Sequence, residues 1–577
     1  MPSRRIHRWT LATFLALAAA VGLQVAAIHG HSLSGDGAYH LLAGHQALRY
    51  GTNDLNLEHP PLAKLVVSLP LLFADEPLAE PTRIEDALAA ANHLYGKADL
   101  VRRATLCGRY LALAVFVLPF LAACFLLGRR FAGTAAGVVL VLLTSLSLSV
   151  LPYLTLLQTD TAVSLAFLAT LLAATSYQEA PGWRRATLLG LAAGFGLAVK
   201  FSALLLGPTV LVAFALATRR RPAWRRLAEL LVASVAVVAV VEGAYLAANP
   251  RYDAELGRET IHTYCKNRGT LAVDREMAPY EATLLAVEDV DPRLAQWLTG
   301  FLGVRIQNRI GVYPSYAFGE VRSQGRWWYF PVVLLLKTPL VLLLAAAVLV
   351  ATVLAAARTG RKAGACRKDP RWILVGVTVA VYLAASVTSN YNLSVRHMLP
   401  ILPLFYLPLA VFLGRRRRWA TVVVGALLVE SLAVAPYGMA ATNTWWLGDS
   451  NPTRFVLGAG NLEYRQSFVG LARYAEKEGI EPLHVLYPTL ADEVLAAYLP
   501  AAKSARPGDE IRPGWYAVNV TVEQLVPALL KAPPGTVYND DELRRAAASW
   551  EPFWRDVVAA GEDHGWVAGT YHLYRVP

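Results

Sequence analysis

Cysteine and charge are both scarce in this sequence. Its 577 residues include four cysteines, and no two of them have the spacing of a metal-ligand pair. Cys107 and Cys124 share one apolar run, Cys265 lies in a polar segment, and Cys366 lies in a basic loop. We therefore expect neither a zinc site nor a structural disulfide. Charged residues make up 17% of the chain, whereas soluble proteins carry about 25%, which argues against a soluble globular protein.

The motifs of nucleotide-using and hydrolytic enzymes are also missing. The sequence contains no GxxxxGK[ST] loop, no GxGxxG after a strand, no GxSxG elbow and no HExxH pair. Chemistry driven by ATP and hydrolysis by a triad therefore lack support. We find no internal repeat and no low-complexity tract either.

Apolar residues, by contrast, are abundant and form long blocks. They account for 55% of the chain, and the blocks approach the roughly 20 residues that a helix needs to cross a bilayer. The sequence predicts an all-α polytopic membrane protein with about eleven transmembrane helices. The first run is too long for a typical signal peptide, so we expect it to stay as a helix. The approximate spans are 9–30, 105–127, 131–150, 160–177, 186–199, 201–217, 227–248, 329–356, 372–388, 398–413 and 419–440.

Basic residues orient these spans. With the N-terminus inside, the short outer loops hold only Lys200 and Arg396, as the positive-inside rule requires. The net charge of +12 is therefore a sign of topology and not of nucleic-acid binding. Segments 31–104, 249–326 and 441–577 are predicted to lie outside. The basic residues predicted inside are Arg4, Arg5, Arg8, Arg129, Arg130, Arg184, Arg185, Arg219, Arg220, Arg221, Arg225, Arg226, Arg358, Arg361, Lys362, Arg367, Lys368, Arg371 and Arg415 to Arg418.

Residues 441–577 differ from the preceding part, because their apolar runs are shorter and charges and prolines appear. Segments 481–489, 514–520 and 569–576 are typical of strands, and segments 469–479 and 541–561 are typical of helices. We predict two domains, a transmembrane domain over 1–440 and a small extracytoplasmic α/β domain over 441–577.

Several polar residues are predicted to lie at the outer membrane boundary, where ionisable groups are functional candidates. Acids and cations at one depth indicate a site for an anionic group. The candidates are Asp36, His59, Lys64, Asp160, Lys200, Tyr329, Lys337, Arg396 and His397.

Each candidate also has a purely structural interpretation. Asp36 stands between two glycines and is compatible with a turn. Asp160 is placed to start a helix, Lys200 and Arg396 to extend toward the headgroups, and His59 to shape an extended turn before two prolines.

Seven motifs occur in order along the chain: Asp36, HPPLAK at 59–64, QTDTAVSLAFL at 158–168, GFGLAVKFSALLL at 194–206, FGEVRSQGRWWYFPVVLLLKTPL at 318–340, SVRHMLPILPLFYL at 394–407 and GNLEYRQSFVGLARY at 460–474. Together they resemble the bacterial polyprenyl-phosphate-sugar-dependent glycosyltransferases of the protein O-mannosyltransferase and aminoarabinose-transferase type, in the glycosyltransferase-C superfamily. The chain departs from that pattern at Gly37, where family members commonly carry a second acid. It departs again at Glu463-Tyr464-Arg465, where Asp-Trp-Gly is more usual.

The resemblance implies a glycosyltransferase-C-like fold and transfer of a monosaccharide from a polyprenyl phosphate to an acceptor hydroxyl. Asp36 would be the general base, a role worth about 10²- to 10⁴-fold, and Asp160 would orient the acceptor or a cation. A single base implies inversion at the sugar carbon. Cations can stabilise the leaving phosphate without a metal, so we expect no cofactor. The residues implied for the phosphate are Lys64, Lys200, Lys337 and Arg396, with His59, Tyr329 and His397 beside them.

Other functions remain open at this stage. A lipid-linked sugar flippase or transporter would also need many spans, although no two-fold repeat is evident. An enzyme with an oligosaccharide donor is a further alternative, but the acidic metal-binding motifs usual in oligosaccharyltransferases are absent. The expected partners are the lipid-linked donor, membrane lipids and an acceptor protein or glycolipid, with no nucleic acid. The composition suggests a GC-rich bacterial source, and we expect a multi-pass protein of the bacterial cytoplasmic membrane. Neither the sugar nor the acceptor is identified.

Overall fold

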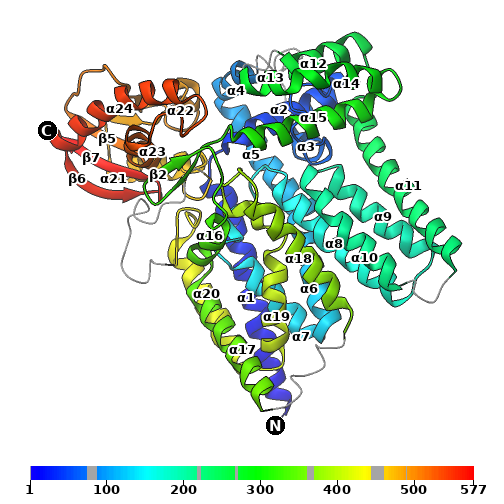
Figure 1. Cartoon of the computed structure of the whole chain (residues 1–577). Helices are drawn as coiled ribbons and strands as arrows, with labels where there is room; N and C mark the ends of the chain where they lie inside the picture. The colour runs from blue at the N-terminus through cyan, green and yellow to red at the C-terminus, as the bar shows by residue number, and fades with distance from the viewer. Residues whose placement is uncertain are drawn as a thin grey trace.

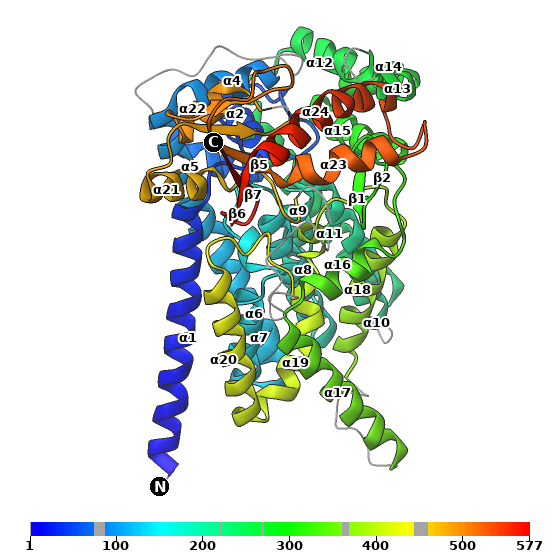
Figure 2. The same ribbon diagram turned by 90° about the vertical axis from the view of Figure 1, so that its left-hand side faces the viewer.

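The computed structural model describes residues 2–73, 87–217, 222–266, 271–359, 369–443, 460–488 and 490–577. Most of these residues are helical, and apolar helices form a bundle that makes up the lower half of the molecule in Figures 1 and 2. The helices of this bundle are α1 (Pro2–Gly30), α5 (Ala98–Ala112), α6 (Leu118–Ala132), α7 (Thr134–Ser145), α8 (Asp160–Glu179), α9 (Trp183–Leu197), α10 (Gly207–Ala217), α11 (Ala223–Ala248), α17 (Leu340–Arg358), α18 (Arg371–Val387), α19 (Leu402–Gly414) and α20 (Arg417–Val434).

Within the described residues, five helical stretches are long and apolar enough to cross a membrane: Thr13–Gly30, Ala98–Ala132, Asp160–Glu179, Ala223–Ala248 and Leu340–Arg358. Shorter apolar helices of 10–17 residues accompany them. The predicted class, a polytopic helical membrane protein with a small C-terminal α/β part, is confirmed. The predicted number of spans stays a prediction.

Two predicted spans differ from simple helices. The stretch Ala98–Ala132 is continuous, but residues Leu113–Val117 form a π-helical turn just before Pro119, where the helix adjusts to the missing backbone donor. The predicted span 329–356 is broken into α16 (Tyr329–Lys337) and α17. Thr338 is extended there because Pro339 follows it.

The remaining segments gather at one end of the bundle, opposite the N-terminus (Figure 2). Their helices and strands are α2 (Gly35–Tyr50), α3 (Leu62–Ser68), α4 (Ala87–Gly96), α12 (Ala254–Lys266), α13 (Leu271–Met277), α14 (Glu281–Glu288), α15 (Pro292–Ile310), β1 (Ser315–Ala317) and β2 (Glu320–Arg322). This grouping matches the one that the basic residues predict, whereas the sidedness itself stays a prediction. Residues 219–221 and 361–368 of the basic loops lie outside the described residues.

The C-terminal region contains a mixed sheet at the same end of the molecule (Figure 1). Its strand order is β4-β3-β5-β7-β6, in which β3 runs parallel to β4 and β5, while β7 runs antiparallel to β5 and β6. The predicted strands and helices are all found; β4, β6, α22 and α23 are additional. The elements are α21 (Phe468–Glu478), β3 (Leu483–Leu486), α22 (Asp492–Tyr498), β4 (Lys503–Ser504), β5 (Gly514–Asn519), α23 (Val520–Lys531), α24 (Asp540–Ala560), β6 (Glu562–Val567) and β7 (Tyr571–Val576). The boundary at residue 441 stays a prediction.

Candidate functional site

Asp36 lies in the first turn of α2, immediately after α1 ends. It is therefore not a turn residue, although helix N-termini favour an acid for the same electrostatic reason that they bind anions. The backbone just before it is held by the segment after the last bundle helix, because Ser32 N donates to Gln466 O at 2.9 Å and Gly35 N donates to Tyr464 O at 3.1 Å. The side chain of Asp36 is 46% exposed, so another molecule can reach it.

Arg396 joins Asp36 to a second carboxylate. It lies in the short 3₁₀ helix η8 (Val395–Met398), with Nη2 3.5 Å from Asp36 Oδ2 and Nη1 3.9 Å from Asp160 Oδ2. Nη1 also donates to Gln158 Oε1 at 2.5 Å. Partial burial by itself would raise the pKa of Asp36, but Arg396, His40 and Tyr464 together outweigh it and hold that pKa below its ordinary value. Asp36 is therefore ionised at neutral pH.

Asp160 begins α8, as its helix-start interpretation expects, and it also has a specific partner. Lys200 Nζ lies 2.5 Å from Asp160 Oδ1, and Asp160 is buried. Lys200 precedes η5 (Phe201–Leu206) and keeps 20% of its side chain exposed. It therefore points into the cluster and does not simply extend toward headgroups.

His59 and Lys64 reach the same cluster from the Pro-Pro segment and α3. Lys64, Lys200 and Asp160 all act electrostatically on His59. Burial first, and then His40, Lys200 and Lys64, lower the pKa of His59 well below its ordinary value. Burial lowers the pKa of Lys64 to about 7, and Lys64 Nζ donates to Asn56 O at 2.5 Å.

His397 lies next to Arg396 in the sequence and is neutral. Burial, Lys200 and Arg396 lower the pKa of His397 to about 3. It can therefore donate or accept a hydrogen bond in this cluster, but it adds no positive charge at neutral pH.

The distance between α2 and α3 is set by direct backbone contact. A Cβ on Gly44 would lie 2.2 Å from Lys64 O and 2.3 Å from Ser68 Oγ. Ser68 Oγ also donates to Leu41 O at 2.9 Å. This contact fixes Lys64 relative to Asp36, which lies on the same helix as Gly44.

Tyr329 and Lys337 lie in a different group of residues. Lys337 Nζ donates to three backbone carbonyls, those of Met439 at 2.6 Å, Ala441 at 2.9 Å and Asn461 at 2.7 Å. Asn461 Nδ2 donates to the Tyr329 hydroxyl at 2.8 Å. An ammonium group has three protons, so Lys337 has none left for a phosphate. These hydrogen bonds favour a structural role for Lys337.

Sequence reasoning assigned no role to three further residues of the cluster, namely His40, Gln158 and Tyr464. The rings of His40 and His59 are 5.1 Å apart, edge to face, and the Arg396 guanidinium lies 4.4 Å from the centre of the Tyr464 ring. Gln158 and Tyr464 belong to the quoted motifs, which was their only signal in the sequence.

Several polar atoms of this cluster are buried and make no hydrogen bond of normal geometry with the described residues. Such atoms are expected where a polar ligand binds, because burial without a partner is costly. They are His40 Nε2, His59 Nδ1, Gln158 Nε2, Arg396 Nε and Tyr464 Oη.

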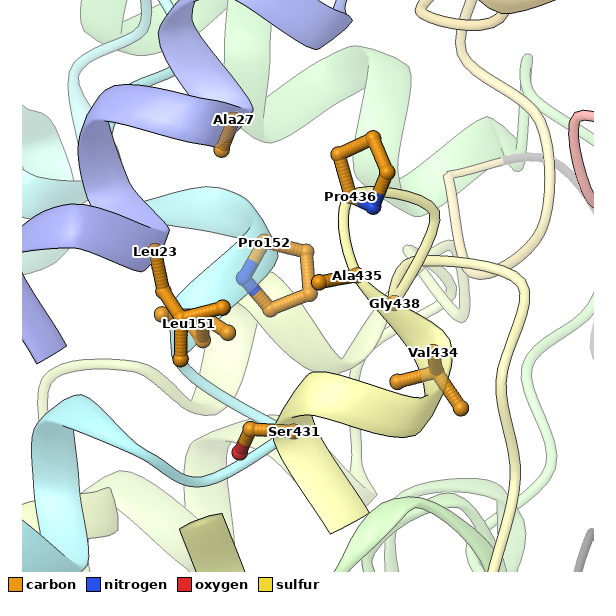
Figure 3. Close-up of a pocket in the computed structure, with 9 residues that line it drawn as sticks. All are labelled: Leu23, Ala27, Leu151, Pro152, Ser431, Val434, Ala435, Pro436 and Gly438. Atoms are coloured by element: carbon orange, nitrogen blue, oxygen red, sulfur yellow. The ribbon is translucent and has the colours of Figure 1, made fainter. Parts of the chain in front are cut away.

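The described residues offer neither a metal site nor, in the pocket described next, a polar binding site. No group of three or more His, Cys, Asp or Glu side chains among them could hold a metal ion. The pocket in Figure 3 lies between α1, the 3₁₀ helix η4 (Leu151–Tyr153) and α20, and Ser431 is the only one of its lining residues with a polar side chain. That hydroxyl already donates to Leu146 O at 2.5 Å.

Comparison with known proteins gives one family match and several structural similarities. Residues 100–244 match the family described as dolichyl-phosphate-mannose-protein mannosyltransferase. Comparison with curated proteins gives no match.

Two solved structures illustrate the structural similarity. ArnT from Cupriavidus metallidurans bound to undecaprenyl phosphate has a TM-score of 0.45 and 12% identity over 97% of each chain. The oligosaccharyltransferase of Archaeoglobus fulgidus, tethered to an acceptor peptide containing the NVT sequon, has a TM-score of 0.42 and 11% identity over 98% of this chain and 75% of the other. Since both TM-scores are below 0.5, neither similarity decides the fold. The family match, which includes the motifs 158–168 and 194–206, agrees with the resemblance to glycosyltransferases of the protein O-mannosyltransferase type over that part of the chain.

Proposed function

We propose that this protein transfers a monosaccharide, mannose or a related sugar, from a polyprenyl phosphate to an acceptor hydroxyl. The observation that carries this proposal is the half-exposed Asp36 carboxylate beside Arg396, in a cluster that also holds Lys200, Lys64 and Asp160. The family description over residues 100–244 supports a donor of this kind.

Asp36 acts as the general base in this proposal. Its carboxylate takes the proton of the acceptor hydroxyl while the hydroxyl oxygen forms a bond to the anomeric carbon. The bond from that carbon to the phosphate oxygen breaks, and the lipid phosphate leaves with the electron pair. One displacement of this kind inverts the sugar carbon. The lowered pKa of Asp36 keeps it ionised, as a base must be at neutral pH.

The leaving phosphate is stabilised by the cations of the cluster. Lys64, Lys200 and Arg396 supply the charge, and His59 and His397 offer hydrogen bonds as neutral rings. Charge fixed in a buried site stabilises a developing anion better than water does. Asp160 orients Lys200 and Arg396, since it lies between them. Tyr329 and Lys337, which the sequence also suggested for the phosphate, both bond to Asn461 and have a structural role in this proposal.

We also propose where the reaction takes place and what it needs. We place the protein in the cytoplasmic membrane of a bacterium, with a cytoplasmic N-terminus and the cluster and C-terminal domain on the outer face. The acceptor is a protein or a glycolipid, and the transfer needs no metal. The rival function, a lipid-linked sugar flippase or transporter, would require polar groups across the bundle, whereas this cluster lies at one of its ends.

The test uses purified full-length protein in detergent with radiolabelled polyprenyl-phosphate mannose and a mixture of acceptor lipids and peptides. Asp36→Asn keeps the shape of the site and removes the base, so donor binding should persist while transfer is lost. Asp492→Asn is the matched control, because Asp492 is also a first-turn acid, in α22, and is 68% exposed. A flippase would consume no donor without a second compartment. Turnover of Asp36→Asn at the wild-type rate would show that Asp36 is not the base.

A further inference from the structure

The segment Gly460–Phe468, here called the strap, runs between the two pieces of chain that carry Asp36 and Arg396. On one side, Ser32 Oγ donates to Arg465 O at 2.5 Å and Gly35 N donates to Tyr464 O at 3.1 Å. On the other side, Ser394 Oγ donates to Gly460 O at 2.7 Å and Val395 N donates to Asn461 Oδ1 at 2.8 Å. The strap therefore ties the start of α2 to the start of η8.

Tyr464 is the strap residue that enters the space between the two charges. Its ring lies under the Arg396 guanidinium, with 4.4 Å between the guanidinium carbon and the ring centre. A cation over an aromatic face is attracted by the ring and is kept from rotating. The ring also lies next to the helix start, because a Cβ on Gly35 would be 3.8 Å from it.

The hydroxyl of Tyr464 is one of four tyrosine hydroxyls among the described residues that are buried without a hydrogen-bond partner of normal geometry, and it lies beside Asp36. It is buried and makes no hydrogen bond of normal geometry with the described residues, whereas buried tyrosine hydroxyls normally find a partner. It nevertheless lies close enough to Asp36 to lower the pKa of that carboxylate. Packing alone would need only the ring, which phenylalanine also supplies, so the hydroxyl calls for a separate explanation.

We propose that Tyr464 is a positioning residue: its ring holds the Arg396 guanidinium, and its hydroxyl faces the Asp36 carboxylate. Without the ring, Arg396 closes onto Asp36 and Asp160 in a tighter ion pair, which occupies the base and withdraws the cation from the phosphate. The strap thus keeps the base and the phosphate-binding cation 3.5 Å apart at their closest atoms. This inference rests on the proposed transfer reaction.

The hydroxyl also affects when Asp36 is ionised, together with the other groups around it. Removal of the hydroxyl should raise the pKa of Asp36, because one favourable contact with the ionised form is lost. The titratable and charged groups that act on Asp36 or feel its charge are Tyr39 and His40 from α2, Asp160 from α8, Arg396 and His397 from η8, and Tyr464 from the strap.

Three substitutions at this position separate the ring from the hydroxyl. Tyr464→Leu removes both, and kcat should fall about 10-fold or more, because a buried cation loses its aromatic partner. Tyr464→Phe keeps the ring, so kcat at high pH should stay close to wild type while the acidic limb of kcat/KM moves to higher pH. Tyr464→Trp keeps a ring over Arg396 and should recover most of the activity that Tyr464→Leu loses.

The control is Trp515→Leu, which removes another ring from an arginine, Arg575 at 5.7 Å in the C-terminal sheet. It should leave kcat and the pH profile unchanged. Wild-type kcat in Tyr464→Leu would overturn the inference. Equal losses in all three variants, with matching losses of thermal stability, would show a merely structural role. Wild-type protein that consumes no donor would refute the proposed reaction instead.

Discussion

Two groups of cations lie at the end of the bundle opposite the N-terminus, and their hydrogen-bond and ion-pair partners differ. Lys337 is saturated, because three carbonyl oxygens between 2.6 and 2.9 Å take its three protons. Arg396 and Lys200 instead face carboxylates, and buried polar atoms beside them, on Gln158 and Tyr464, have no partner of normal geometry in the described chain. A saturated cation holds the chain together, whereas a cation beside unsatisfied groups has room for a ligand.

Among the substitutions that distinguish the two groups of cations, the largest loss of activity is expected at Arg396. Arg396→Ala should lower kcat/KM about 10²- to 10³-fold, as removal of one donor to a developing anion typically does. The measurement is donor consumption by purified protein, with Arg326→Ala as a control, since Arg326 lies over Trp328 at 5.6 Å instead of beside Asp36. Activity within a factor of about two of wild type would place Arg396 with the structural cations.

Lys337→Met should act on stability and not on chemistry. It leaves three buried carbonyls without their shared donor, which should cost about 3 kcal/mol or more. Thermal unfolding in detergent measures the loss, and the KM for donor of the folded fraction should stay at the wild-type value. A raised KM with unchanged stability would move Lys337 into the phosphate site.

A smaller effect is expected from pH through Lys64, whose pKa burial lowers to about 7. The ammonium is present below that pH and is lost as the pH rises through it. The kcat/KM for donor should therefore fall above pH 7, by up to about 10-fold per pH unit. Lys64→Arg carries a charge that does not titrate in this range, so its profile should lack this limb. The same limb in both proteins would assign it to another group.

Chelation should have the smallest effect of all. Treatment with EDTA followed by gel filtration should leave transfer unchanged within about two-fold, because the proposed phosphate site uses cationic side chains. Loss of activity that Mg²⁺ or Zn²⁺ restores would refute metal-independence without touching the assignment of Asp36.

Apolar runs and alternation were sufficient to predict the helical bundle and three of the five strands of the C-terminal sheet. The structure brings seven of the nine candidate residues together. The differences between the predicted and the observed structure have local physical causes. Pro339 breaks a run that hydropathy alone treats as one span, and Lys337, just before the break, donates to three backbone carbonyls. Asp36 resembles a turn residue between its glycines, whereas tertiary bonds to the strap let a helix begin there.

The role of Tyr464 was beyond what the sequence could predict. The proposed role depends on the contact between Arg396 and Asp36, which are 360 positions apart in the sequence. Local patterns report neighbours along a helix or strand, so they carry no information on such a contact. Only the motif at 460–474 marked the strap as more than a linker.

The close approach at Gly44 has a consequence for how this site tolerates change. Asp36 and Lys64 belong to two helices whose spacing is set by one missing methyl group and not by interlocking side chains. Substitutions among the surrounding apolar residues can therefore change the packing around α2 and α3 without altering that spacing. A methyl group at Gly44 would force the two helices apart. The distance between Asp36 and Lys64 should therefore withstand many substitutions among the surrounding apolar residues but not the substitution of Gly44 by alanine.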